Sequence, residues 1–253
     1  MPPPRSSKII RGIRFKGIGF GFTLAEVLIT LGIIGVVATL TLPSILTQKV
    51  EKERVSQLKK VYSTLNQAYL QTVSENGTPD EWGMETMDDE LSHYIFAKNF
   101  RPYLRLSKDC IDLPPGEVAK VCQVQLTDST TAKSVILIDG TTVTFRVYDG
   151  NCTHMGRNVC GEFRIDLNGH RLPNKNGEDI FRLYFSKDGV IPFGLQNSIY
   201  TFERGCNKNI TSPYPTYDPA NMYACAGWVI YNENMDYLHC DDLSWDGKHK
   251  CDK

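Results

Sequence analysis

One carboxylate, Glu26, lies in an otherwise apolar run that extends from Phe22 to Leu42. An isolated charged side chain in the hydrocarbon of a bilayer costs about 2.5–3.5 kcal/mol on insertion scales. We therefore hypothesise that an acid in such a run has a function and that it pairs with a cationic partner. The position of Glu26 near one end of the run lowers this cost but does not explain why the residue is there.

Eight cysteines form a second group of reactive side chains, and all of them follow the apolar run. No pair has the C-x-x-C spacing of a zinc ribbon or a thioredoxin-type redox site. The sequence predicts up to four disulfides in an oxidising compartment, but eight cysteines permit about 105 connectivities. Cys152–Cys160 is the favoured single pair because it closes a short loop. The disulfide candidates are Cys110, Cys122, Cys152, Cys160, Cys206, Cys225, Cys240 and Cys251.

The remaining titratable residues do not form a recognisable catalytic set. The chain lacks G-x-S-x-G, H-E-x-x-H, Walker and Rossmann glycine motifs. His154 follows Cys152 by two residues, which allows a Cys–His nucleophile, but a disulfide would make Cys152 unreactive. We therefore expect no enzymatic activity and no cofactor.

Hard oxygen ligands are concentrated in the segment "DLNGHRLPNKNGEDIF", which contains Asp166, Asn168, Asn174 and Asp179. Asp-x-Asn-Gly partly resembles a calcium loop, but the further ligands and the terminal glutamate of an EF-hand are missing. Tight turns at the two Asn-Gly pairs are the favoured interpretation. We predict no metal site, and calcium binding by residues 166–179 stays open as an alternative.

The apolar run is long enough to cross a membrane, because the 21 residues from Phe22 to Leu42 span about 30 Å as a helix. The basic residues before it favour a cytoplasmic N-terminus and an exported remainder, in agreement with the disulfides. A secretory signal is disfavoured since the run is too long and lacks a clean A-x-A cleavage site. A plain signal anchor leaves the carboxylate unexplained. The basic residues are Arg5, Lys8, Arg11, Arg14 and Lys16.

The residues around the carboxylate resemble those of a known family. Gly21-Phe22-Thr23-Leu24-Ala25-Glu26, followed by the apolar run and Pro43, resembles the N-terminus of type IV prepilins and of the pseudopilins of type II secretion. The resemblance implies that a prepilin peptidase cuts between Gly21 and Phe22 and methylates the new N-terminus. Residues 1–21 would be a basic leader that is removed, and the apolar run would be retained. Gly19-Phe20 offers a competing site, but only Phe22 places a glutamate four residues beyond the new N-terminus.

The resemblance also supplies a partner for Glu26. Cleavage would create an α-amino group at Phe22, which is largely cationic at neutral pH. In a bundle of such helices, the carboxylate of one subunit can pair with the amine of its neighbour, and a wrong axial register would leave both charges unpaired. The expected partners are homologous pilin or pseudopilin subunits, the prepilin peptidase, an inner-membrane assembly platform and membrane lipid. No nucleic acid is expected.

A helical pattern continues after Pro43 and ends near Asn76. Pro43 removes a backbone donor and is expected to bend or loosen the helix. The expected helix covers residues 22–76, with residues 22–42 transmembrane and residues 43–76 amphipathic and packed on the chain's own head. The apolar stripe recurs at steps of three and four and consists of Val55, Leu58, Tyr62, Leu65 and Tyr69.

Residues 77–253 are predicted to form a globular head. "SVILIDGTTVTFRVYDG" predicts a hairpin with a two-residue turn at Asp139-Gly140 and one buried face. "EFRIDLNG" and "DIFRLYFSKDG" alternate in the same way. Several antiparallel strands after one long helix imply a pilin-like α+β fold, with the sheet on the amphipathic part of the helix and a disulfide-stapled C-terminal region. Trp228, Tyr231 and Tyr237 in that region are interpreted as packing residues, with a glycan or partner surface as the alternative.

The expected function is that of a structural subunit, a pseudopilin or pilin, of a bacterial type II secretion or type IV pilus fibre. It would cross the inner membrane once, with its head in the periplasm or outside the cell. One alternative is a minor tip pilin whose head binds a glycan, DNA or a secreted protein. The other is a membrane-anchored exoprotein that does not polymerise. The sequence does not separate a secretion machine from a pilus machine, or a major from a minor subunit.

Overall fold

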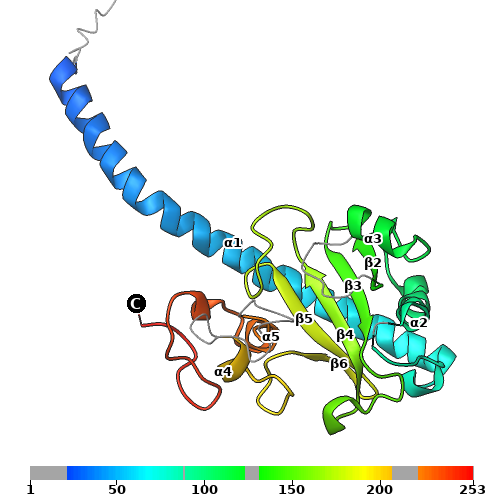
Figure 1. The fold of residues 1–253 in the computed structure, drawn as a ribbon. Helices are drawn as coiled ribbons and strands as arrows, with labels where there is room; N and C mark the ends of the chain where they lie inside the picture. Colours follow the sequence, from blue (N-terminus) through cyan, green and yellow to red (C-terminus); the bar gives the residue numbers. More distant parts are fainter. Residues whose placement is uncertain (1–21, 88, 123–130, 207–221, 253) are drawn as a thin grey trace, which may run out of the picture. The chain divides into compact units, whose positions relative to one another are not determined.

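The computed structural model describes residues 22–87, 89–122, 131–206 and 222–252. The proposed leader, residues 1–21, lies outside the described residues. The chain divides into two compact units, one that ends at Thr47 and one that extends from Gln48 to Lys253. Helix α1 (Leu24–Asn76) contributes to both units, and the second unit contains all the other elements (Figure 1).

The part of α1 within the second unit packs through the stripe predicted from the sequence. Its buried residues are Val55, Leu58, Val61, Leu65, Ala68, Tyr69 and Thr72. Tyr62, also placed in the stripe, is partly buried against the same core. The helix ends where expected, because Gly77 takes a left-handed φ of 76° and donates its N–H to the carbonyl of Val73 at 3.1 Å.

Six strands form one antiparallel sheet in which spatial order follows sequence order. The long helix and the antiparallel sheet confirm the α+β class. In the part of the chain that the structure describes, five short helices or single helical turns lie between or after the strands. The strands are β1 (Leu106–Asp109), β2 (Lys133–Leu137), β3 (Thr142–Val147), β4 (Val159–Asp166), β5 (Ile180–Ser186) and β6 (Gly189–Pro192). The α-helices after α1 are α2 (Glu90–Phe100), α3 (Pro115–Val121), α4 (Phe202–Gly205) and α5 (Ala226–Asn232).

The predicted hairpin is β2–β3, but its turn is longer than the two residues expected from Asp139-Gly140. Leu137 donates its N–H to the carbonyl of Thr141 at 2.9 Å, so three residues lie within the closing pair. Gly140 takes a φ of 88°, which is typical of the left-handed position in a three-residue hairpin loop. Asp-Gly therefore indicated the hairpin correctly and its loop length incorrectly.

One face of the sheet packs on α1 and α2 through aromatic rings. Phe96 of α2 stacks on Phe185 of β5 with ring centroids 3.9 Å apart, and it meets Phe145 and Phe163 at 5.2 and 5.0 Å. Tyr69 of α1 contacts the same Phe185 ring edge-on at 6.4 Å. Figure 1 shows this part of α1 lying across the sheet. Alternate residues of β3, β4 and β5 therefore form the core that the sequence pattern indicated.

The opposite face of the sheet is also buried, and the prediction of a single buried face is wrong. Every residue of β3, β4 and β5 is buried. Arg146 lies opposite Glu162, and Arg164 lies opposite Arg182. Aromatic residues pack on this face, with Tyr148 beneath the Arg146 guanidinium at 5.6 Å. The polar residues that alternate with the core are thus interior residues as well.

Glu162 is the buried anion that offsets part of the positive charge of the arginines on this face. Its carboxylate accepts a hydrogen bond from Arg164 Nε at 2.8 Å and lies 3.7 Å from Arg182 and 4.0 Å from Arg146. Burial alone would raise its pKa, but the charges of the three arginines outweigh burial and lower the pKa to about 2. The carboxylate is therefore ionised across the physiological range.

We expect Glu162→Gln to lower the free energy of unfolding by about 3–5 kcal/mol, because the three buried arginines lose the carboxylate that faces them. The wild-type contribution should be fully present above pH 4.5 and decline as the pH falls towards 2, since the folded pKa is the lower one. Chemical unfolding at pH 7 and pH 3 measures both effects. A difference between the two proteins that is as large at pH 3 as at pH 7 would contradict the assignment of this ion cluster.

Candidate functional site

Glu26 lies in the first turn of α1, where it forms a capping box with Thr23. Its Oε2 accepts hydrogen bonds from Thr23 N and Thr23 Oγ1, both at 2.8 Å. Thr23 Oγ1 in turn accepts the N–H of Glu26 at 3.2 Å. This reciprocal arrangement satisfies two of the backbone donors left over at a helix N-terminus. One oxygen of the carboxylate therefore has a local structural role.

The second oxygen, Oε1, accepts no hydrogen bond from the residues that the structure describes. The local role thus occupies half of the carboxylate. Phe22, at the proposed cleavage site, is exposed and immediately precedes the capping threonine. Gly21, the other residue of that site, lies outside the described residues.

Pro43 lies inside α1, and the helix continues on both sides of it. Thr47 Oγ1 donates to the carbonyl of Pro43 at 3.0 Å. Since proline has no N–H, the carbonyl four residues before it has no helical donor at this point. The helix nevertheless continues through residue 43 despite this missing hydrogen bond.

The first part of α1 is long and apolar enough to cross a membrane, with a window of mean hydropathy 2.1 and no buried residue. Its large apolar side chains are exposed, including Leu28, Ile33 and Val37. Gly32 and Gly35 have open space around the position of a Cβ atom. An exposed apolar surface of this length is typical of a segment that crosses a membrane.

All eight cysteines form disulfides within the chain. The predicted pair Cys152–Cys160 is confirmed. Each bond joins cysteines that are consecutive in the sequence, so each loop closes locally. The other three bonds are Cys110–Cys122, Cys206–Cys225 and Cys240–Cys251.

The imagined Cys–His nucleophile is not present. The Cys152 sulfur is bonded to Cys160, and the ring of His154 packs on Tyr148 with centroids 4.7 Å apart. Burial lowers the pKa of His154, and the nearby Asp149 partly opposes this effect. The imidazole therefore serves as a packing group beside the disulfide loop.

The segment from Asp166 to Asp179 forms tight turns, as the favoured interpretation predicted. Gly169 and Gly177 take left-handed φ values of 63° and 74°. The Asp179 carboxylate accepts N–H groups of Asn174 at 3.0 Å and Lys175 at 2.6 Å, so its oxygens close the loop. Among the described residues, no group of three acidic, histidine or cysteine side chains is arranged to hold a metal ion.

Two of the three C-terminal aromatic residues belong to the core. Trp228 stacks on Phe202 with centroids 4.1 Å apart, and Tyr237 donates its hydroxyl to the carbonyl of Gly177 at 2.7 Å. Both are buried, in agreement with the packing interpretation. Tyr231 differs, since 57% of its surface is exposed.

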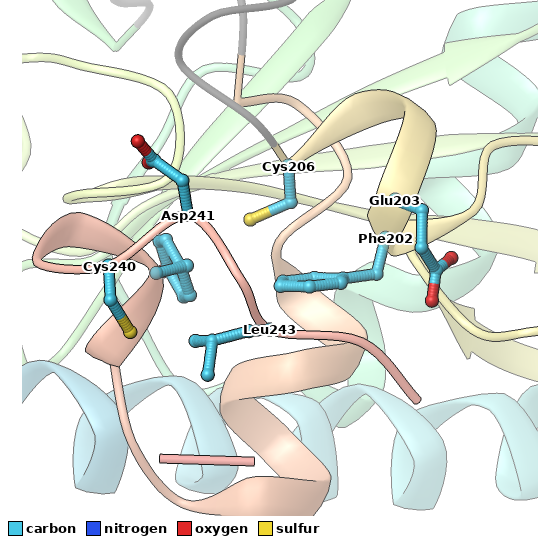
Figure 2. A pocket seen from close by; sticks show the side chains of 7 residues that line it. Phe202, Glu203, Cys206, Cys240, Asp241 and Leu243 are labelled. Atoms are coloured by element: carbon cyan, nitrogen blue, oxygen red, sulfur yellow. The ribbon is translucent and has the colours of Figure 1, made fainter. Parts of the chain in front are cut away.

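A small pocket lies between α4 and the C-terminal segment (Figure 2). Its volume is about 180 Å³, which is below the roughly 300–1,000 Å³ typical of ligand sites. Figure 2 shows the carboxylates of Glu203 and Asp241 turned away from Phe202 and Leu243. Cysteines of two disulfides contribute to its wall. The lining residues are Phe202, Glu203, Cys206, Tyr237, Cys240, Asp241 and Leu243.

Sequence reasoning missed two features of these sites. The capping role of Thr23 and Glu26 was readable from the T-x-x-E spacing before an apolar run. The ion cluster around Glu162 had no such signal, because alternating charged residues on a strand look the same on a solvated face and on a buried one.

Fold and site together define an α+β protein with an apolar N-terminal helix and a disulfide-bonded head. Residues 45–217 match the family described as "Family of unknown function (DUF6613)", and the chain belongs to this family. No curated protein and no solved structure matches the chain. The matched region begins after the apolar run, so Glu26 lies outside it, and α5 lies beyond its end.

We expect the double variant Cys152→Ser, Cys160→Ser to lower the free energy of unfolding by about 2–3 kcal/mol. Without the disulfide the short loop is open in the unfolded chain, which therefore gains conformational entropy. Chemical unfolding without reductant provides the measurement, and the single variant Thr153→Ser serves as a control in the same loop. Equal stability of the double variant and the wild type would show that this bond does not constrain the chain.

Proposed function

We propose that this protein is a structural subunit, a pseudopilin or pilin, of a bacterial fibre that assembles through α1. The observation that carries the proposal is Glu26, the only charged residue between Phe22 and Thr47. A carboxylate in a membrane-length apolar helix is unfavourable unless it meets a cation. No lysine or arginine within this stretch can neutralise it.

The proposed cation is the α-amino group of a neighbouring copy. Cleavage between Gly21 and Phe22 by a prepilin peptidase would place an amine four residues before Glu26. Within one helix the capping box already engages Oε2, and Oε1 points to no donor in the described residues. A second subunit can therefore add its amine without disrupting the helix N-terminus.

This pairing explains why assembly would be specific. Two charges that are unfavourable in lipid become one hydrogen-bonded pair only when helices of two copies lie in the correct axial register. The exposed apolar side chains of the span would contact lipid before assembly and neighbouring spans afterwards. Partners would be homologous subunits, the peptidase and an inner-membrane assembly platform.

The proposed location is the bacterial inner membrane, crossed once, with the head exported. Four disulfides support an oxidising compartment for the head. The basic residues before the span support a cytoplasmic N-terminus. Secretion pseudopili and type IV pili would both accommodate this topology.

The alternatives are a minor tip pilin and an anchored exoprotein that does not polymerise. A tip subunit would occur at the ends of sheared fibres, whereas a main subunit would occur along their length. An exoprotein would occur in no fibre. No feature of the pocket or of Tyr231 favours a particular ligand over the structural role.

We expect Glu26→Val to leave cleavage and membrane insertion intact and to reduce incorporation into fibres at least tenfold, since the neighbour's amine loses its counter-charge. Immunoblots of sheared fibres and of the membrane fraction measure the two quantities. Thr30→Val is the matched control, because Thr30 Oγ1 bonds only to the backbone of its own helix.

Thr23→Val distinguishes subunit pairing from simple helix capping. It removes the cap but keeps the carboxylate, so pairing predicts a much smaller loss of fibres than Glu26→Val causes. Equal losses in the two variants would assign Glu26 to capping alone. Normal fibres from Glu26→Val would refute the proposed function.

A further inference from the structure

We propose that β1, the open edge of the six-stranded sheet, excludes a further strand from a second copy of this chain. Two features carry this role, the β-bulge at Ser107 and the exposed charge of Lys108. Heads that lie side by side would then not join their sheets edge to edge. This role would belong to the head alone and does not depend on fibre assembly.

The two edges of the sheet have different surroundings. An edge strand leaves one row of backbone N–H and C=O groups without a strand partner, and another chain can pair with that row. Among the described residues the edge strands are β1 and β6. β6 is mostly buried, Pro192 has no N–H to offer, and Gly227 of α5 donates its N–H to the carbonyl of Phe193 at 2.7 Å. In β1, by contrast, Ser107 and Lys108 are exposed. A second copy could therefore approach β1 more easily than β6.

The ladder between β1 and β2 contains one extra residue on β1. Leu106 lies opposite Leu137. Two residues further on, Lys108 lies opposite Ile136, so Ser107 has no residue of β2 directly opposite it. The Ser107 hydroxyl donates to the carbonyls of Leu137 and Ile136, at 3.0 and 3.2 Å. A bulge of this kind bends and twists the strand, which makes the edge a poor template for a straight partner strand.

The charge of Lys108 is the second obstacle to pairing. An antiparallel pair of two β1 strands would bring the lysines of both copies onto the same four-residue stretch, and like charges that face each other across strands are unfavourable. The adjacent carboxylate of Asp109 is already engaged. It lies 2.5 Å from Arg101 Nε and accepts the N–H of Ile111 at 3.1 Å. The positive charge at this edge therefore opposes a second copy.

The ends of β1 limit how many residues could pair. Cys110, which directly follows the strand, is buried and bonded to Cys122. Before the strand, Leu104 donates its N–H to the carbonyl of Arg101 in a turn at 3.3 Å. The strand has four residues, fewer than the five or six that are typical. A partner strand would thus gain few hydrogen bonds to offset the desolvation of Lys108.

Self-association of the full chain in detergent micelles tests this role. We expect the double variant Ser107→Val, Lys108→Val to dimerise at least tenfold more tightly than the wild type, because the edge loses its charge and gains two strand-forming residues. Sedimentation equilibrium measures the association. Lys120→Val is the matched control, since it removes an exposed lysine from α3 and should associate like the wild type. A double variant that associates no more than the wild type, or no more than Lys120→Val, would overturn the proposal.

A second measurement locates the contact and includes the unaltered chain. Hydrogen exchange of the amides in residues 106–109 should slow with rising protein concentration in the double variant and stay constant in the wild type. Slowing in the wild type would overturn the proposal without any variant, because the native edge would then accept a strand. Association of the double variant with unchanged exchange in β1 would also overturn it, since the copies would then be joined elsewhere.

Discussion

The proposed function depends on one interaction, the neutralisation of the Glu26 carboxylate in an apolar helix. The helix is long and apolar enough to cross a membrane, and a carboxylate near its start would be costly there unless it met a cation. The capping box with Thr23 supplies hydrogen bonds but no charge. We propose that a neighbouring copy supplies this charge, so that the span acts through assembly.

The head also buries charged groups, and it pairs them with one another within the same chain. Glu162 faces three arginines on a buried face of the sheet, and its one negative charge lies against all three of these cations. Four local disulfides constrain the chain of the head further, and such bonds persist in an oxidising compartment. The charges of the head are thus paired within one chain, whereas our proposal for the span involves a second copy.

Local patterns in the sequence were sufficient for the long helix and for the central strands of the sheet. The alternation at Val143, Phe145 and Val147 identified a core strand, and the stripe from Val55 to Tyr69 identified the packed part of α1. Cys152–Cys160 was predictable because the two cysteines are close in sequence. The other three pairs also join consecutive cysteines, but their wider spacing did not single them out among the possible connectivities.

Long-range pairing explains what the sequence could not supply. Arg146, Glu162 and Arg182 come from three strands, and only the register of the sheet shows that they surround one another. Their alternation alone therefore suggested a solvated face. β1 was missed for a similar reason, because Leu106–Asp109 has almost no apolar alternation and is a strand through its pairing with β2.

The most direct test of the central claim is the intact mass of the mature protein isolated from its native membrane. We predict a chain that begins at Phe22 and carries one added methyl group, because only this processing would create the amine proposed to face Glu26. A chain that retains Met1, or one that begins beyond Pro43, would contradict it, since the carboxylate would then have no such partner or would be absent.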